Sequence, residues 1–273
     1  MIRQPAVAGQ FYNASPEVLR ADVARYFDSS ATPHIATAVV SPHAGLIYSG
    51  HVAGAVYSHV SLPQTVILIG PNHTGLGPVV SVFPEGTWLI PGGELAIDRT
   101  VTAELLARYP EAEADTSAHQ SEHCLEVQLP FLRQARADVR IVPIVLGTTR
   151  EEVCRDLGLC LAEIIEAHAA QRGRSAMPLL IASTDMSHYE PDSVTRAKDR
   201  FALEAIQRLD PEGLQAAVRA HEITMCGLGP TVTMLHAVRA LGATNSSLVR
   251  YATSGEISGD LDRVVGYGGF VIT

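Results

Sequence analysis

The sequence has no run of basic residues. Lys and Arg number 20 against 29 Asp and Glu, which gives a formal net charge of −9. Because nucleic-acid binding needs clustered Lys and Arg to neutralise phosphates, this balance argues against a nucleic-acid partner. The apolar runs are also too short to cross a bilayer, and the segment Met1 to Pro5 has no signal-peptide apolar region. We therefore expect a cytoplasmic protein with no membrane partner.

Cysteine is scarce, and its spacing forms no known motif. The chain has 4 cysteines and no C-x-x-C pair, which argues against a zinc ribbon or a thioredoxin-like motif. In a cytosolic protein these thiols are reduced. The sequence also lacks the H-E-x-x-H pattern of zinc hydrolases and a glycine-rich phosphate-binding pattern. Any metal or active site must therefore be built from residues that are far apart in the chain.

What the sequence does contain is a regular alternation of apolar strands and helices. Ser15-Pro16-Glu17 and Asp210-Pro211 begin two helices, since Ser and Asp are good N-caps and Pro suits the first helical position. Asp98 is placed to cap a third helix, over residues 99–108. The alternation predicts an α/β fold with a central, mostly parallel or mixed β-sheet and helices on both faces. Because there is no linker and no internal repeat, we expect one domain over residues 1–273.

Histidines follow three of the predicted strands. His43 comes after strand 36–40, where Pro42 ends the strand, and His73 comes after strand 66–69. His188 follows strand 179–182. Ligands bind at the carboxyl ends of strands in α/β proteins, so the three turns predict a shared site. The first two strands are consecutive in the chain, and we expect them to be neighbours in a parallel sheet.

His43 and His73 are candidate metal ligands. Imidazole is the commonest metal ligand near neutral pH, and two imidazoles fixed by Pro and Gly turns make half of a typical site. The alternative is that each is a turn histidine bonded to the backbone. Cys226 lies just before a helix predicted from residue 230, whose free N–H groups would favour a thiolate, a soft metal ligand. A packed thiol is the alternative for Cys226.

Three further residues are candidates for acid–base chemistry. Asp185 and His188 are either metal ligands or an acid–base pair in which the carboxylate orients the imidazole, and Asp185 is also placed to cap a helix. His123 falls in the first turn of a helix predicted from apolar residues 125, 129 and 132. Glu122 beside it is explained by the helix dipole alone, so we take only His123 as a candidate.

Five motifs resemble, in order, those of the Memo family. They are S-P-H-A-G at 41–45, G-P-N-H at 70–73, E-H-C-L-E at 122–126, S-T-D-M-S-H at 183–188 and M-C-G at 225–227. Prokaryotic members are called AmmeMemoRadiSam system protein B, and the resemblance covers essentially the whole chain. The family is similar in fold to class III extradiol dioxygenases of the LigB type, which hold non-haem Fe(II) with two His and one carboxylate.

The resemblance implies roles for individual residues. His43 and His73 match the two histidine ligands, and His188 matches the acid–base histidine near the metal. Cys226 falls where the dioxygenases have their carboxylate, and a thiolate there shifts the preference toward copper(I) or zinc. The resemblance further implies iron- or copper-dependent redox activity, and radical-SAM and AMMECR-type proteins as partners.

Two functions are compatible with the sequence. The first is a metal-dependent redox or oxygenase-like enzyme that acts on an unidentified small molecule. The second is a non-enzymatic module that kept an old enzyme pocket and binds a peptide or protein, as the animal members' binding of phosphorylated receptor peptides implies. The sequence favours the enzyme, because a metal site needs a thiol and several imidazoles in one crevice and a pure binder does not. Zinc hydrolysis fits the ligand types but lacks its sequence signature.

Overall fold

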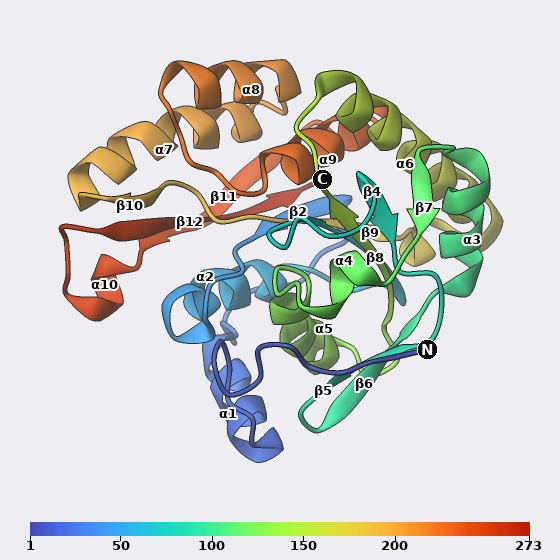
Figure 1. Cartoon of the computed structure of the whole chain (residues 1–273), viewed down its shortest axis with the longest axis horizontal. Helices are drawn as coiled ribbons and strands as arrows, with labels where there is room; N and C mark the ends of the chain where they lie inside the picture. The colour runs from blue at the N-terminus through green and yellow to red at the C-terminus, as the bar shows by residue number, and fades with distance from the viewer.

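The computed structural model describes all residues, 1–273, as ten α-helices, two short 3₁₀ turns and a twelve-stranded mixed sheet (Figure 1). The main path of the sheet runs β1-β5-β6-β8-β3-β9-β2-β12-β10, with β11 paired to β12, β4 paired to β8, and β7 paired to β4. The expected α/β class is confirmed. The strands are β1 (Ile2–Arg3), β2 (Ala38–Ser41), β3 (Thr65–Pro71), β4 (Val80–Val82), β5 (Thr87–Ile90), β6 (Gly93–Ile97), β7 (Ala112–Ala114), β8 (Arg140–Leu146), β9 (Leu179–Ser183), β10 (His188–Glu190), β11 (Ser246–Thr253) and β12 (Val264–Ile272).

Helices cover both faces of the sheet. Figure 1 shows α6 to α9 on one side and α1, α2 and α5 on the other. None of the helices is both long enough and apolar enough to cross a membrane. The helices are α1 (Pro16–Tyr26), α2 (Leu46–Ser58), α3 (Arg99–Arg108), α4 (Ser117–Gln120), α5 (Leu129–Ala135), α6 (Glu151–Arg172), α7 (Asp192–Gln207), α8 (Pro211–Ala220), α9 (Leu228–Ala240) and α10 (Gly255–Ser258), with 3₁₀ turns η1 (Glu126–Gln128) and η2 (Arg174–Ala176).

The centre of the sheet is buried on both faces. Val40 and Ile67 belong to the core cluster under α6 and α9, while Val39 and Val66 belong to the cluster under α1, α2 and α5. Successive residues of a strand point to opposite faces, so a strand covered on both sides needs a continuous apolar run. This requirement explains why the central strands are recognisable in the sequence.

Strands β8, β3, β9 and β2 lie side by side and parallel, so their carboxyl ends meet at one edge of the sheet. The expectation that β2 and β3 are neighbours is wrong, because β9 lies between them. Chain order does not fix spatial order in a parallel sheet, since the crossover helices allow a later strand to enter between two earlier ones. Because β9 lies between β2 and β3, it ends between the turns that carry His43 and His73.

Several local predictions can be compared with the structure. The cap of α3 is confirmed, since the Asp98 carboxylate accepts the N–H groups of Thr100 and Val101 at 3.2 and 3.3 Å. Pro143 lies within β8, although β8 has neighbours on both sides. On one side of β8, β6 pairs with residues 140–141 and β4 pairs with residues 144–146. Pro143 lies in the gap between these two partners, so its missing N–H removes no hydrogen bond from the sheet.

The helix expected around Glu122 and His123 is absent. These two residues lie in a loop after α4, and the helical path begins only with the turn η1 and α5. The Glu122 carboxylate accepts the N–H groups of His123 and Cys124 at 2.9 and 3.0 Å, which holds the backbone in a non-helical turn. Pro130, near the start of α5, has no N–H to donate to an earlier turn.

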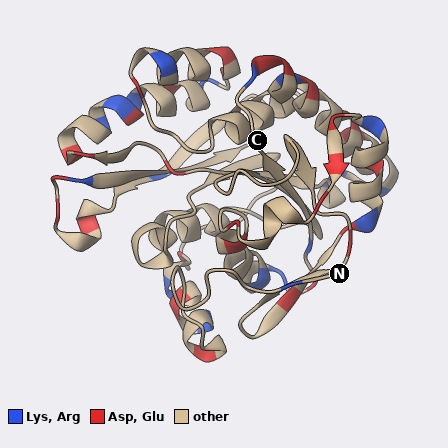
Figure 2. Ribbon diagram, viewed as in Figure 1, with Lys and Arg blue, Asp and Glu red and all other residues tan.

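Lys and Arg are scattered over the outer helices in Figure 2 and do not gather in one patch.

Candidate metal centre

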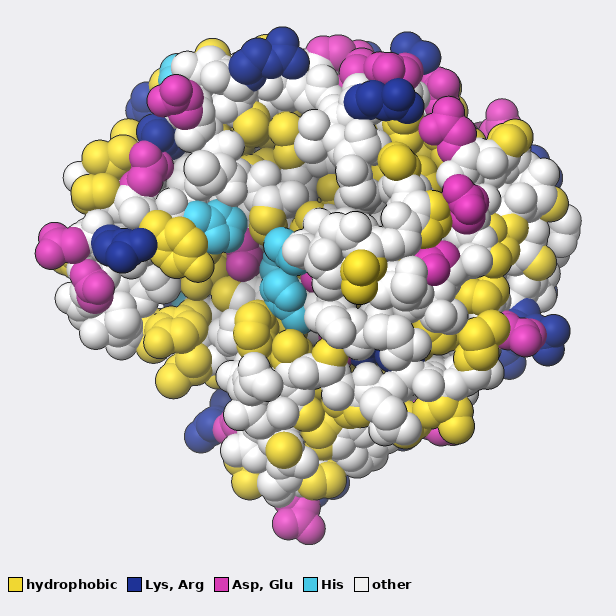
Figure 3. Space-filling view, viewed as in Figure 1, with side chains coloured by type: hydrophobic (Ala, Val, Ile, Leu, Met, Phe, Trp, Pro, Cys, Tyr) yellow, Lys and Arg dark blue, Asp and Glu magenta, His cyan; other side chains and the backbone are white.

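The candidate residues meet in one open cavity of about 730 Å³ at the carboxyl edge of the central strands. Figure 3 shows histidine side chains gathered in a hollow of the face it presents. All six residues singled out in the sequence line this cavity: His43, His73, His123, Asp185, His188 and Cys226.

His43 is buried, and its ring is fixed by Ser183 at the end of β9. The Ser183 hydroxyl donates its proton to the Cys124 carbonyl at 2.7 Å, and it accepts an N–H from Gln128 at 2.8 Å. His43 Nδ1, 2.9 Å from the same oxygen, must therefore donate to it. The Nε2 atom of neutral His43 is thus unprotonated, and its lone pair faces the Cys226 sulfur at 3.3 Å. Burial, followed by the neighbouring histidines, holds the pKa of His43 well below its usual range, so the ring stays neutral and able to bind a metal.

His73 is oriented by Glu122. Its Nδ1 lies 2.9 Å from Glu122 Oε1, and its backbone N–H donates to Oε2 at 2.6 Å. A carboxylate only accepts, so Nδ1 carries the proton and Nε2 is free. Carboxylate–histidine pairs of this kind orient ligand histidines in metalloproteins. In the sequence the helix dipole alone explains Glu122, so its role as a positioning residue was missed.

Glu122 remains charged although its side chain is only 1% exposed. Burial alone would raise its pKa, but the hydrogen bonds from His73 and from the Cys124 and His73 backbone outweigh burial and lower the pKa to about 2. A charged carboxylate behind His73 strengthens that ring as a donor.

The N-terminal arm holds the loop that carries Glu122 and His123. Arg3 is fully buried and donates to the carbonyls of His119 and Glu122 at 2.7 and 2.6 Å, and it pairs with Glu126 at 2.6 Å. Glu126 also accepts the backbone N–H groups of Ala6 and Val7. These contacts join residues more than a hundred positions apart, so they leave no local signal in the sequence.

Cys226 faces His43. Its sulfur lies 3.3 Å from His43 Nε2, and it accepts the Asp185 N–H at 3.3 Å. The approach depends on Gly227, since a Cβ there would lie 2.4 Å from Thr184 Cβ. Backbone N–H groups of Asp185 and Gly227 favour the thiolate, as expected, but burial and the charge of Asp185 outweigh them. Burial and the charge of Asp185 raise the pKa of Cys226 to about 12, so a bound cation is needed to stabilise the thiolate.

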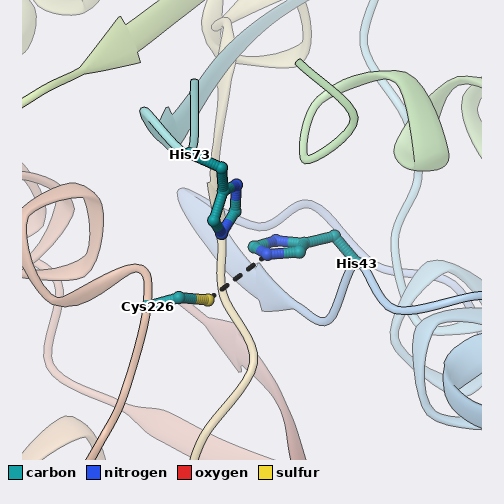
Figure 4. Close-up of side chains that lie close together, drawn as sticks. All are labelled: His43, His73 and Cys226. Atoms are coloured by element: carbon teal, nitrogen blue, oxygen red, sulfur yellow. Dashed lines mark hydrogen bonds between the residues drawn. The ribbon is translucent and has the colours of Figure 1, made fainter. Parts of the chain in front are cut away.

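Three donors thus converge on one point. One donor atom each from His43, His73 and Cys226 lies within 4.8 Å of the other two, and Figure 4 shows the side chains directed toward one another. The donors come from the turns after β2 and β3 and from the turn before α9. Two imidazoles with unprotonated Nε2 atoms and one thiol fit a transition metal such as copper, iron or zinc, and they do not fit magnesium or calcium.

Asp185 holds the candidate site in place by a hydrogen bond to the backbone of His43. It is buried, and its Oδ1 accepts the backbone N–H of His43 at 2.8 Å, which fixes the turn that carries this ligand. Burial raises the pKa of Asp185 to about 6.

His188 takes its orientation from a different residue. Its Nδ1 donates to the Thr224 carbonyl at 2.9 Å, and its backbone N–H donates to the Thr224 hydroxyl at 2.7 Å. Nε2 of the neutral ring therefore carries a free lone pair. Thr224, rather than Asp185, plays the orienting part that the sequence suggested for the carboxylate.

His123 lies against both candidate histidine ligands. Its ring is stacked on His73 with centroids 4.6 Å apart, and it meets His43 edge-on at 5.4 Å. Phe11 of the N-terminal arm covers it at 4.7 Å. Burial lowers the pKa of His123, so it is a neutral imidazole next to the donor cluster.

Comparison with known proteins decides the family. The family model described as Memo-like protein matches residues 3–271. The chain belongs to the Memo family. It is 38% identical to the MEMO1 family protein MK0963 of Methanopyrus kandleri, with 99% of each chain covered. It is 40% identical to a MEMO1 family protein of Aquifex aeolicus, covering 99% of this chain and 98% of the relative.

A solved structure supports the fold of this Memo-family chain. The crystal structure of uncharacterized protein JW3007 from Escherichia coli K12 aligns with a TM-score of 0.54 over 85% of this chain and 99% of the other. The two sequences are 14% identical, so the likeness concerns the fold alone.

A second group of potential ligands lies away from this cavity. Glu151, Glu212 and His236, on α6, α8 and α9, also bring their donor atoms within 4.8 Å of one another. His236 Nε2 pairs with Glu151 at 3.0 Å, and Arg239 pairs with Glu212 at 3.0 Å. In this second group Glu212 is thus paired with a guanidinium, and Glu151 contacts the imidazole of His236.

Proposed function

We propose that this Memo-family chain binds one transition-metal ion through His43, His73 and Cys226 and uses it for redox or oxygenase-like chemistry. The observation that supports the proposal most strongly is that both imidazoles have an unprotonated Nε2, because buried partners hold Nδ1–H. A thiol lies within reach of the same point. This is how proteins prepare histidine ligands for a metal.

Iron and copper are the proposed ions, with zinc as a further candidate. The thiolate and imidazole donors favour soft or intermediate cations. Iron or copper held there would supply one-electron chemistry with oxygen, which zinc does not.

The chain's own residues supply proton transfer beside the metal. His188 Nε2 is free because Thr224 takes Nδ1–H, so the ring accepts a proton from a ligand in the cavity and returns it. His123 is neutral and lies against both ligand rings, where it is placed to bond to a second group on the ligand. Asp185 keeps the His43 turn in position through the backbone N–H.

Anaerobic titration of the purified, metal-free chain with Fe(II), Cu(I) or Zn(II) tests the binding step. We expect one ion per chain. A preparation that folds normally and takes up none of the three ions contradicts the proposal.

Oxygen consumption tests the redox step. After free metal has been removed, the iron- or copper-loaded chain should consume oxygen with ascorbate as the electron donor. The zinc-loaded chain is the matched control, because zinc has no redox chemistry. Equal rates in the loaded forms would reject redox activity and leave metal binding standing.

A peptide- or protein-binding role is the second candidate, because apolar side chains surround the cavity. Tyr189 lines the cavity and is 66% exposed, and Ile257 and Leu261, 47% and 56% exposed, are next in sequence to the lining residues Ser258 and Asp260. The radical-SAM and AMMECR-type partners remain predictions, as does the cytoplasmic location. Binding of a peptide that is unaffected by loss of the metal ligands would favour this second role.

A further inference from the structure

The cavity has two ends of different chemistry. The inner end carries the donor cluster, and the outer end is formed by β10, α10 and the loop before β12. Arg263, in that loop, is the only Lys or Arg among the eighteen residues that line the cavity. It is exposed, and no carboxylate is paired with it. An unpaired guanidinium at a cavity mouth is available to an anionic ligand.

Aromatic rings line the space between the two ends. Phe11, Tyr48, Tyr189 and Tyr267 all face the cavity. Tyr189 is the most exposed of them, and it has a positive φ of 61°, which is rare for a residue with a bulky side chain. Its ring lies 5.5 Å from the Arg263 guanidinium and 5.8 Å from the His188 ring. Tyr189 therefore lies between Arg263 at the outer end of the cavity and His188 toward the donor cluster.

From this arrangement we propose that the cavity takes a small carboxylic acid with a planar, apolar body. The carboxylate pairs with Arg263, the body lies against Tyr189 and the other aromatic rings, and the far end reaches His188 and the donor cluster. The inference rests on the proposed function only for what happens at that far end. Recognition by Arg263 does not need the metal.

The charges at the mouth favour a carboxylate over a phosphate. Asp260, three residues earlier in the chain, also lines the cavity, so the outer end carries one positive and one negative side chain. This surrounding suits a single negative charge better than two. The guanidinium also matches the two oxygens of a carboxylate in a paired geometry. A cavity of about 730 Å³ lies within the range of about 300–1,000 Å³ typical of small-molecule sites.

The test measures the binding of two matched probes, 3-phenylpropionate and its uncharged amide, to the metal-free and the zinc-loaded chain by calorimetry or NMR. We expect the acid to bind more tightly than the amide. Arg263→Gln should weaken binding of the acid about tenfold or more and leave the amide unchanged, because only the acid uses the charge-assisted bond. Arg263→Lys should restore part of the difference, since it keeps the charge without the paired geometry.

Arg219→Gln is the control, because Arg219 is exposed on α8, outside the cavity. Inorganic phosphate serves as a third probe. Equal binding of acid and amide, an unchanged acid affinity in Arg263→Gln, or tighter binding of phosphate than of the acid would each overturn the inference. If the acid binds through Arg263 but the chain takes up no metal, the proposed function fails and this recognition stands.

Discussion

The two groups of potential ligands differ in what surrounds their donors. In the His43, His73 and Cys226 cluster, each imidazole has a buried partner on Nδ1, and the sulfur has no cation beside it. In the group of Glu151, Glu212 and His236, the glutamate side chains are 35% and 61% exposed and are already paired.

The comparison shows that closeness of donors does not by itself make a metal site. A carboxylate that is exposed and paired with Arg or His gains little from a cation, because water and its partner already stabilise its charge. A buried thiol with a raised pKa and two oriented imidazoles gain a great deal, because the cation supplies the missing charge. The following predictions concern metal affinity, from the largest expected change to the smallest.

Cys226→Ser should cause the largest loss. A neutral hydroxyl is a poorer and harder donor than a thiolate, so copper(I) affinity should fall by more than about 100-fold, beyond the effect of losing an orienting partner. Competition titration with a copper(I) chelator measures it. Cys160→Ser on α6 is the control, because Cys160 lies far from the cavity lining. Unchanged affinity in Cys226→Ser would remove Cys226 from the site.

Glu122→Gln should cause an intermediate loss of about 10- to 100-fold, the usual effect of removing a partner that orients a ligand histidine. The amide group of Gln would face N–H groups that now donate to the carboxylate, so His73 loses its fixed orientation. The same titration measures it, with the melting temperature recorded to confirm folding. Glu212→Gln, which makes the same change in the second group, should leave the metal affinity unchanged. Equal losses in the two variants would contradict the proposed difference between the two groups of ligands.

His188→Ala should leave metal affinity unchanged while lowering oxygen consumption by about 10²- to 10⁴-fold, the typical contribution of a general acid or base. The reason is that His188 is oriented by Thr224 and stands outside the three-donor cluster. Affinity and rate are measured on the same preparation. Loss of the metal together with the activity would make His188 a ligand.

The smallest effect is expected at the second group. Changing both Glu151 and His236 to Gln should leave the number of bound ions at one per chain, because Glu151 is 35% exposed and already contacts His236. Elemental analysis of the loaded variant checks this. A second ion that binds to the wild-type chain and disappears in this variant would show that the two groups are both metal sites.

The sequence singled out residues that the structure brings together, but not the partners that orient them. His43, His73 and Cys226 could be chosen because each follows a strand or precedes a helix, and position relative to an element is a local property. The partners that orient them could not, because Ser183, Glu122 and Arg3 come from other segments and reach the site only through the order of the strands.

In the fold, too, only the features that depend on neighbouring residues could be predicted. The apolar runs predicted the central strands, and Asp98 predicted the start of α3, since both depend on neighbouring residues. The position of β9 between β2 and β3 was not predictable, because crossover connections leave strand order free. The loop at Glu122 was mistaken for a helix, since a side chain that binds its own backbone competes with helix formation.

The most direct test of the central claim is X-ray absorption spectroscopy on the zinc-loaded chain. With two imidazoles and one thiolate as ligands, the account predicts one sulfur at about 2.3 Å and nitrogen or oxygen neighbours at about 2.0–2.1 Å. The sulfur signal should vanish in Cys226→Ser and persist in Cys160→Ser. A first shell made only of nitrogen and oxygen in the wild-type chain, or a sulfur signal that survives Cys226→Ser, would contradict the account.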